Sequence, residues 1–485
     1  MQTKPAVECS EPAAPLVQEQ EPSAPGQILE KVFDTFNREG IRYCVMHGYD
    51  GYPHRVGSDV DCIVEKGTSP ELLHSVLQRN SSRIGAVVVR KQGYHFVLAG
   101  KNEDGFPIFL TLDLATANNI DGMQFHASDE ALASRQRYRQ FWIPAPAVEF
   151  GCYLVRCIAL ARLDEIRVRR LSRLFLQNNL GCREQIDRFW DAQSAELIVT
   201  AARTNNWETV RQNLDHIRSE LRRRAVLRNP TQYVLNRLQG VNRRLGRLWR
   251  PDGLTVAVLG PDGAGKSSLI EAVGLRLLGP FSRATCSGFA PSPRELFRRG
   301  LHSTSQPHGL PSRSLPVSLL RAAYWLVYHL ADTFRVRVAM ARSTLMFYDR
   351  QFIDILVDQR RYRYGGPVWL LHMIGNILPK PDIVIGLDAP TEIMQARKQE
   401  LSCEETSRQR VAYTSLVKGL VNGVILDASK PSGQVARDVC DLIIAHLVDR
   451  IAHRWRLDED GQFMPGHRVS TRPEDKPPYT SATST

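Results

Sequence analysis

Residues 255–279, TVAVLGPDGAGKSSLIEAVGLRLLG, constrain the fold of this 485-residue chain more than any other stretch. A strand-like apolar run leads into a glycine-rich turn, which leads into a lysine, two serines and a helix. Gly260 to Ser267 match every specified position of the phosphate-binding motif G-x-x-x-x-G-K-S. Glycines let successive backbone N–H groups turn inward around an anion, and the following helix adds the positive end of its dipole. The stretch therefore predicts a nucleotide site between a strand and a helix.

Each residue type in this loop has a chemical role that depends on its position. The ammonium group of Lys266 is expected to reach the β- and γ-phosphates of ATP, and the hydroxyl of Ser267 is expected to bind Mg²⁺. The loop alone does not name the reaction, because it serves kinases, GTPases, motors and transporters. The expected nucleotide-binding residues are Gly260, Pro261, Asp262, Gly263, Ala264, Gly265, Lys266, Ser267 and Ser268.

Strand-like and helix-like segments alternate downstream of RPDG, a turn at residues 250–253. The expected strands are TVAVLG, LMFYD, DIVIGLD and GVILDAS, and the expected helices lie near residues 265–278, 315–342, 367–377, 391–400 and 432–450. Such alternation predicts a parallel sheet with helices on both faces. We therefore expect a doubly wound α/β domain of the P-loop type over residues 251–452.

This C-terminal half resembles the thymidylate kinase group of nucleoside-monophosphate kinases. The resemblance is carried, in the family's order, by GPDGAGKSS, by the Asp-Arg pair that closes LMFYDR, by PDIVIGLDAPTEIMQARKQE and by VILDAS. It implies that Asp262 faces the phosphate acceptor and that Arg350 holds the transferring or acceptor phosphoryl group. It also implies that Asp349 lies near Mg²⁺.

A basic lid is the last feature that the resemblance implies. Arg397 and Lys398 would begin this lid, and Arg408 and Arg410 are alternative lid residues. Phosphoryl transfer spreads negative charge over the equatorial oxygens, so a kinase needs convergent cations and exclusion of water. The expected catalytic residues are Lys266, Arg350, Asp262 and Arg397.

Two segments depart from the family pattern where the acceptor would bind. ATCSGFAPSPRELFRRG, residues 284–300, replaces an acidic, glycine-containing segment, and QFIDILVDQRRYRYGGP, residues 351–367, replaces the thymidine-stacking helix. The second segment interleaves cations and aromatic rings, namely Arg360, Arg361, Tyr362, Arg363 and Tyr364. This cluster is either a site for an anionic substrate or a structural loop, so the sequence does not name the acceptor.

Residues 27–144 carry a separate group of acids. A helical segment and the strand-like runs YCVMHG, SDVDCIVE, HFVLAG and PIFLTLDLAT predict a small α/β domain. Asp59 and Asp61 alternate along one run, so their carboxylates are expected on one face, with Asp113 on a later strand. Three such carboxylates can bind two Mg²⁺ ions. The alternative interpretation is a turn-associated acidic pair on an exposed strand.

The same pattern resembles the nucleotidyltransferase fold, in which a Gly-Ser pair is followed about ten residues later by an Asp-x-Asp strand. Gly48 and Tyr49 stand at that spacing, with tyrosine in place of serine. The resemblance implies a nucleotidyltransferase-like domain whose metal ligands are Asp59, Asp61 and Asp113, and it leaves open whether catalysis survives.

Residues 145–250 are expected to form an arginine-rich helical connector. Residues 151–250 contain 20 Arg, no Lys and nine Asp or Glu, so this hundred residues holds nearly all of the net charge of +12. Clustered arginines suit nucleic acid or an anionic membrane surface. No recognised nucleic-acid module accompanies them, and a connector with a solvated basic face is the preferred interpretation.

The remaining expectations concern the ends of the chain and the whole protein. Residues 1–26 and 453–485 are expected to be disordered tails, and nine scattered cysteines without a CxxC pair favour a reduced, cytoplasmic protein. We expect an ATP- and Mg²⁺-dependent phosphotransferase that acts on a nucleoside monophosphate or another small metabolite. The alternative is a nucleotide-binding regulatory protein with degenerate sites that acts on nucleic acid or a protein partner. The oligomeric state is not predicted.

Overall fold

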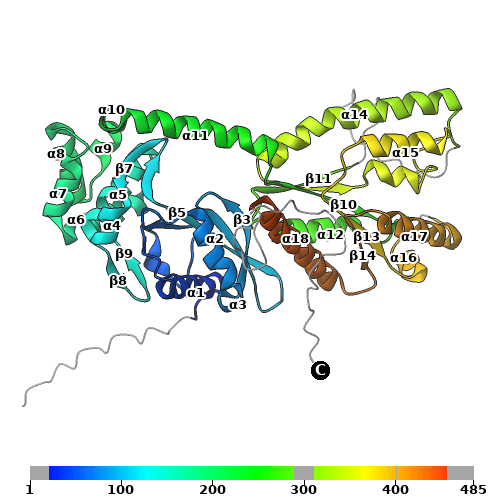
Figure 1. The fold of residues 1–485 in the computed structure, drawn as a ribbon, viewed down its shortest axis with the longest axis horizontal. Coiled ribbons are helices and arrows are strands. Elements are labelled where there is room, and N and C mark those ends of the chain that lie inside the picture. Colours follow the sequence, from blue (N-terminus) through cyan, green and yellow to red (C-terminus); the bar gives the residue numbers. More distant parts are fainter. Residues whose placement is uncertain (1–20, 289–310, 400, 456–485) are drawn as a thin grey trace, which may run out of the picture.

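The computed structural model describes residues 21–288, 311–399 and 401–455, and shows three packed regions along the chain (Figure 1). The expected tails fall mainly outside these ranges, as does much of the segment 284–300. Helix α1 begins at Ala24, before the expected boundary at residue 27. The earlier start has a local cause: the side chain of Ser23 accepts a hydrogen bond from the Gly26 amide, and a proline occupies the first turn.

The N-terminal region is a five-stranded mixed sheet in the order β1-β2-β5-β4-β3. Strands β2 and β5 are parallel, and the other neighbouring pairs are antiparallel. Helices α1 and α2 share a core with alternate residues of the sheet. The elements are α1 (Ala24–Arg38), β1 (Tyr43–Val45), β2 (Val60–Val64), α2 (Pro70–Arg79), α3 (Ser81–Ile84), β3 (Ala86–Gln92), β4 (His95–Lys101) and β5 (Pro107–Ala115).

Two short hairpins and a helix join this sheet to the next region. They are β6 (Ala117–Ile120), β7 (Met123–Ala127), α4 (Ser128–Ala133), β8 (Gln136–Tyr138) and β9 (Phe141–Ile143).

The middle region is helical but is more than a solvated connector. Helices α5 to α10 enclose a hydrophobic core of their own, built around aromatic side chains such as Phe150, Phe175 and Trp207. Many of the expected free arginines are paired, for example Arg170 with Glu149 and Arg183 with Glu196. The helices are α5 (Pro146–Ala159), α6 (Glu165–Gln177), α7 (Asn179–Asp187), α8 (Ala192–Thr204), α9 (Glu208–Gln212), α10 (Leu214–Arg228) and α11 (Pro230–Trp249).

The C-terminal region is a fully parallel sheet in the order β11-β12-β10-β13-β14. Alternate residues of β10 are buried on opposite faces of the sheet. Val256 and Val258 pack with α12 and α18, whereas Ala257 and Leu259 pack with α17. Helices therefore cover both faces, which confirms the expected parallel α/β architecture. Its strands are β10 (Leu254–Leu259), β11 (Arg283–Ser287), β12 (Thr344–Asp349), β13 (Ile383–Asp388) and β14 (Gly423–Asp427).

The helices of this region complete the layers. They are α12 (Lys266–Arg276), α14 (Leu315–Ala341), η2 (Phe352–Leu356), α15 (Val368–Ile377), α16 (Thr391–Arg397), α17 (Cys403–Lys418) and α18 (Ser432–Trp455). Within the described residues, none of the helices is both long and apolar enough to cross a membrane.

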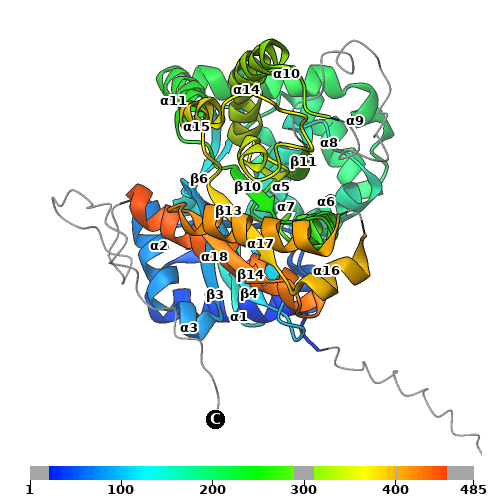
Figure 2. The same ribbon diagram turned by 90° about the vertical axis from the view of Figure 1, so that its right-hand side faces the viewer.

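The N-terminal sheet packs directly on the C-terminal region (Figures 1 and 2). Val89, Val97 and Ala99 of β3 and β4 belong to the same buried cluster as α12 and α18. Lys101 forms an ion pair with Asp441 of α18, with 2.8 Å between Nζ and Oδ2. The two α/β regions therefore share a continuous hydrophobic interface.

Candidate nucleotide site

The phosphate loop lies where the sequence predicts it, between the end of β10 and the start of α12. Gly260, Gly263 and Gly265 have positive φ angles of 150°, 87° and 87°. A Cβ on Gly263 would lie 2.6 Å from the Met394 carbonyl oxygen, so the loop also needs glycine for close packing. The loop is held open toward the carboxyl edge of the sheet, where ligands of open α/β sheets bind.

Lys266 is buried at the first position of α12. Its Nζ donates hydrogen bonds to the carbonyl oxygens of Gly260, at 2.7 Å, and Pro261, at 2.9 Å. Burial lowers the pKa of this lysine from its usual value. The ammonium group is thus placed inside the loop, within reach of any phosphate that the loop holds.

Ser267, in the first turn of α12, and Asp349, at the end of β12, bring two side-chain oxygen groups together. The Ser267 hydroxyl donates to Asp349 Oδ2 at 3.0 Å. Asp349 Oδ1 is buried and has no hydrogen-bond partner among the described residues. The Ser267 hydroxyl and the Asp349 carboxylate, whose Oδ1 is buried and unsatisfied, are a donor set that suits Mg²⁺, because this ion prefers hard oxygen ligands.

A cluster of charges surrounds Asp262 inside the loop. Arg350 donates to Oδ1 at 2.9 Å, Arg361 donates to Oδ2 at 2.5 Å, and Lys266 Nζ lies 3.8 Å from Oδ1. Burial acts to raise the pKa of Asp262, but the three surrounding cations hold it well below the usual range of an aspartate. Arg350 itself has a φ of 79°, a strained conformation for a residue with a side chain.

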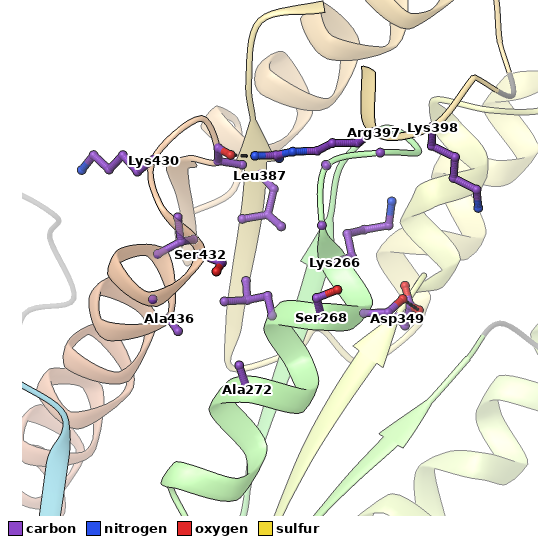
Figure 3. A pocket seen from close by; sticks show the side chains of 18 of the residues that line it. Lys266, Ser268, Ala272, Asp349, Leu387, Arg397, Lys398, Lys430, Ser432 and Ala436 are labelled. Carbon is purple, nitrogen blue, oxygen red and sulfur yellow. Dashed lines mark hydrogen bonds between the residues drawn. The ribbon is translucent and has the colours of Figure 1, made fainter. Parts of the chain in front are cut away.

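The loop opens into a cavity of about 630 Å³ (Figure 3). In Figure 3, Lys266, Ser268 and Asp349 lie on one side of this cavity, and Ser432 and Ala436 of α18 lie on the other. Arg397 reaches across the cavity and donates to the Ala428 carbonyl oxygen at 3.1 Å. The loop after β14, which VILDAS introduces, therefore meets the phosphate loop at a single cavity.

The lid arginines are divided between two places. Arg397 and Lys398 line the cavity. Arg410 instead pairs with Asp388, with 2.8 Å between Nε and Oδ1, and Arg408 pairs with Glu405. The structure therefore brings the first of the two expected pairs, and not the second, to the cavity wall.

The members of the arginine–tyrosine cluster make different contacts. Arg361 points to Asp262, whereas the buried Tyr362 donates to Asp354 at 3.0 Å and Arg363 donates to the Pro311 carbonyl at 3.0 Å. Arg361 is the member that reaches the phosphate loop, and the others stabilise the segment behind it.

Asp354 is a site residue that the sequence reasoning missed. It is buried beside the loop, and burial raises its pKa. Its two oxygens accept hydrogen bonds from Tyr413, at 2.6 Å, and Tyr362. An acid inside the apolar run FIDIL was the signal that could have revealed it.

The N-terminal acids are only partly brought together. Asp61 on β2 and Asp113 on β5 are direct partners across the parallel strand pair. Asp59 precedes β2 in an exposed loop, where Ser58 donates to it at 2.7 Å. Within the described ranges, the three His, Cys, Asp or Glu residues close enough to share a metal ion are Asp191, His216 and Glu220. The three expected ligands are therefore not gathered that closely in the described structure.

Asp61 is the most perturbed of these acids. Burial raises its pKa to about 6, Arg156 opposes the shift, and Asp59 and Asp113 add to it. His47 Nε2 lies 3.3 Å from Asp61 Oδ2. Because burial lowers the pKa of His47 to about 3, this contact joins the carboxylate to a neutral imidazole.

Tyr49, at the position of the serine in the nucleotidyltransferase pattern, is buried and structural. Its hydroxyl donates to Glu149 Oε2 at 2.5 Å, and Arg170 lies over its ring at 4.7 Å. The tyrosine fixes the first region to α5 and α6.

The fold and the loop define the C-terminal region as a P-loop α/β nucleotide-binding domain. No family model matches the chain. The chain is 27% identical to a thymidylate kinase of Xanthomonas oryzae pv. oryzae strain PXO99A. The match extends over 217 residues, which are 42% of this chain and 88% of the relative. Over 224 residues, 39% of this chain and 95% of the relative, it is 23% identical to a thymidylate kinase of Oenococcus oeni.

A solved thymidylate kinase from Candida albicans matches 40% of this chain and 91% of its own, with 16% identity and a TM-score of 0.30. The sequence relatives support a kinase over about 40% of the chain.

Proposed function

We propose that this protein is an ATP- and Mg²⁺-dependent phosphotransferase that moves the γ-phosphoryl group of ATP to a small acceptor. The observation that carries the proposal is the complete phosphate loop with Lys266 buried inside it and Arg350 directly beside it. Positioned cations of this kind stabilise the charge that develops on the transferring group.

The cavity supports the donor side of the proposed reaction. The loop amides and Lys266 would hold the phosphates of ATP, and Ser267 with Asp349 would hold Mg²⁺. Bound Mg²⁺ would neutralise charge on the β- and γ-oxygens. Arg397 and Lys398 would close the opposite wall and limit the access of water.

The acceptor side favours a substrate that already carries a phosphate. An alcohol acceptor loses a proton as it attacks, so it benefits from a nearby general base. The nearest carboxylates are poor bases: Asp262 is held ionised by Arg350 and Arg361, and both oxygens of Asp354 accept tyrosine hydroxyls. A phosphate oxygen needs no base, and arginines bind phosphates well. We therefore favour a phosphorylated acceptor, such as a nucleoside monophosphate or a sugar phosphate.

Incubation with γ-labelled ATP, Mg²⁺ and a panel of nucleoside monophosphates, sugar phosphates and free sugars tests the proposal. We expect label to move to at least one phosphorylated acceptor. ATP hydrolysis that no small acceptor captures, and that rises with DNA or RNA, would instead support the regulatory alternative.

We also propose that the N-terminal domain binds a divalent cation with a nucleotide, as a nucleotidyltransferase-like domain. The direct pairing of Asp61 with Asp113 across two strands supports this proposal. In a Lys266→Ala background, Mn²⁺ with ATP should still raise the melting temperature, and Asp59→Asn with Asp61→Asn should abolish that rise. No rise in the background itself would leave this domain as a scaffold.

A further inference from the structure

Exposed apolar side chains gather on three helices of this molecule. Among the described residues, 27 large hydrophobic side chains are exposed, and 18 of them lie on α11, α14 and α15. They are Val234, Leu235, Leu238, Val241, Leu245, Leu248, Trp249, Leu315, Val317, Leu319, Leu320, Val327, Leu330, Phe334, Val368, Trp369, Met373 and Ile377. Exposed apolar side chains that gather on neighbouring elements point to an interaction surface.

On α11 the exposed apolar residues form one stripe. Successive members from Leu235 to Leu248 are three or four residues apart, and Val234 adjoins the first of them, so they share one side of the helix. Asn236, on the opposite side, anchors α11 by donating to the Gly122 carbonyl oxygen at 2.9 Å. The stripe therefore faces away from the hairpin that supports the helix.

The exposed apolar residues of α14 continue this surface. Ser318, Ala322 and Trp325 bury one side of α14, and Leu330 and Phe334 lie on the other. Arg337 of α14 donates to the carbonyl oxygens at the end of α11, which fixes the two helices together. Both helices lie along the same edge of the molecule in Figures 1 and 2.

The charge of these helices indicates what kind of partner could bind the exposed apolar surface. Together α11, α14 and α15 contain seven arginines, no lysine and one acid, Asp332. A second copy would bring two sets of positively charged helices together, whereas an anionic lipid surface offers both negative charge and an apolar layer for leucine and tryptophan. We propose that the exposed apolar face of α11 and α14, two helices that also carry these arginines, binds the surface of an anionic bilayer.

Vesicle sedimentation of the full chain tests the proposal. One set of vesicles contains phosphatidylcholine with phosphatidylglycerol, and the other contains phosphatidylcholine alone. We expect binding to the anionic vesicles that is at least tenfold tighter, and that weakens as salt is raised. Leu238→Glu with Leu245→Glu should weaken it at least tenfold. Leu180→Glu, on the exposed side of α7, is the matched control and should have no effect.

Equal binding to both kinds of vesicle, or unchanged binding by the double variant, would overturn the proposal. So would a concentration-dependent dimer that the double variant dissolves, because the face would then be covered by a second copy.

A second inference concerns the cavity and rests on the proposed binding of ATP. Phe106, in the loop between β4 and β5 of the N-terminal sheet, lines the C-terminal cavity. The loop is closed by two bonds between Asn102 and Phe106, at 2.8 and 2.9 Å. Arg276 of α12 lies over the Phe106 ring at 4.1 Å, and Arg437 of α18 lies at 5.5 Å.

Arg276 also lines the cavity, on the side away from Asp349 along α12. A guanidinium plane stacks on aromatic rings, and a nucleotide base is such a ring. We infer that Phe106 is a positioning residue that holds Arg276 flat against the base of the bound nucleotide. The N-terminal domain would thus complete the nucleotide pocket of the other domain.

Titration of a non-hydrolysable ATP analogue into the full chain tests this inference without any acceptor. Phe106→Ala should raise the dissociation constant at least fivefold, and Phe106→Tyr should restore it. In turnover assays KM for ATP should rise while kcat stays within twofold. Glu103→Ala, in the same loop, is the control.

Unchanged affinity in Phe106→Ala would overturn the inference. If the parent binds the analogue but transfers no phosphate, the proposed function fails while the role of Phe106 is still decided by the titration.

Discussion

At the scale of single residues, the site depends on how charges are compensated. Asp262 lies among Lys266, Arg350 and Arg361, which hold its pKa down against the effect of burial. Such a cluster is arranged before substrate arrives, so the cations need little reorganisation when a phosphoryl group enters. Arg350 is held there in a left-handed conformation, which places strain next to the loop.

Arg350→Ala should therefore impair phosphoryl transfer far more than ATP binding. We expect turnover to fall by roughly two to three orders of magnitude, the loss typical of an electrostatic donor. Affinity for an ATP analogue should change less than about threefold, because Lys266 and the loop amides remain. Arg360→Ala, an exposed neighbour, is the control. Loss of affinity as large as the loss of rate would show that Arg350 serves the donor instead.

Asp61 gives a pH-dependent prediction. Its folded pKa of about 6 exceeds the usual unfolded value of about 3.9, so the folded state binds the proton more tightly. The ionised carboxylate therefore destabilises the fold, and this cost develops as pH rises from about 4 to about 6 and persists above that. Asp61→Asn should raise the melting temperature more at pH 7.5 than at pH 5, without metal. A fall in melting temperature at pH 7.5 would assign Asp61 a structural role through Arg156.

At the scale of elements, the sequence predicted the parallel sheet and the phosphate loop well. Alternating apolar segments and a complete loop motif depend on local chemistry, and β10, α12 and β12 appear within a few residues of their expected limits. Contacts between distant segments have no such local signal. Asp354 with Tyr413, and Phe106 with Arg276, join residues far apart in the chain, so the sequence did not reveal them.

The contacts of the middle helices could not be predicted from the sequence either. Composition predicted a basic connector, but composition does not show which arginines are paired. Arg170 contacts Glu149, which is fully buried, and Glu149 also accepts the Tyr49 hydroxyl. The helical region is thus tied to the N-terminal sheet through a buried polar network.

Glu149→Ala should destabilise this junction strongly, because it leaves Arg170 without its buried partner. Breaking a buried pair from one side costs about 3–5 kcal/mol. We expect a lower melting temperature by thermal denaturation, with Glu165→Ala, an exposed acid on α6, as the control. Equal effects of the two substitutions would mean that the network adds nothing beyond ordinary surface pairs.

At the scale of the whole molecule, two α/β regions share one buried interface. Val89 and Val97 of the first pack with α18 of the second, and the loop of Phe106 extends to the cavity beside the phosphate loop. The sheet that carries the N-terminal acids therefore packs on the region that carries the phosphate loop.

The most direct test of the central claim is phosphate transfer from γ-labelled ATP by the parent and by Lys266→Ala, with the acceptor panel described above. We expect a labelled phosphorylated product from the parent and a rate lower by roughly two to three orders of magnitude from the variant, with the fold intact by circular dichroism. A variant rate within about threefold of the parent would remove the phosphate loop from the mechanism and contradict the proposed phosphotransferase activity.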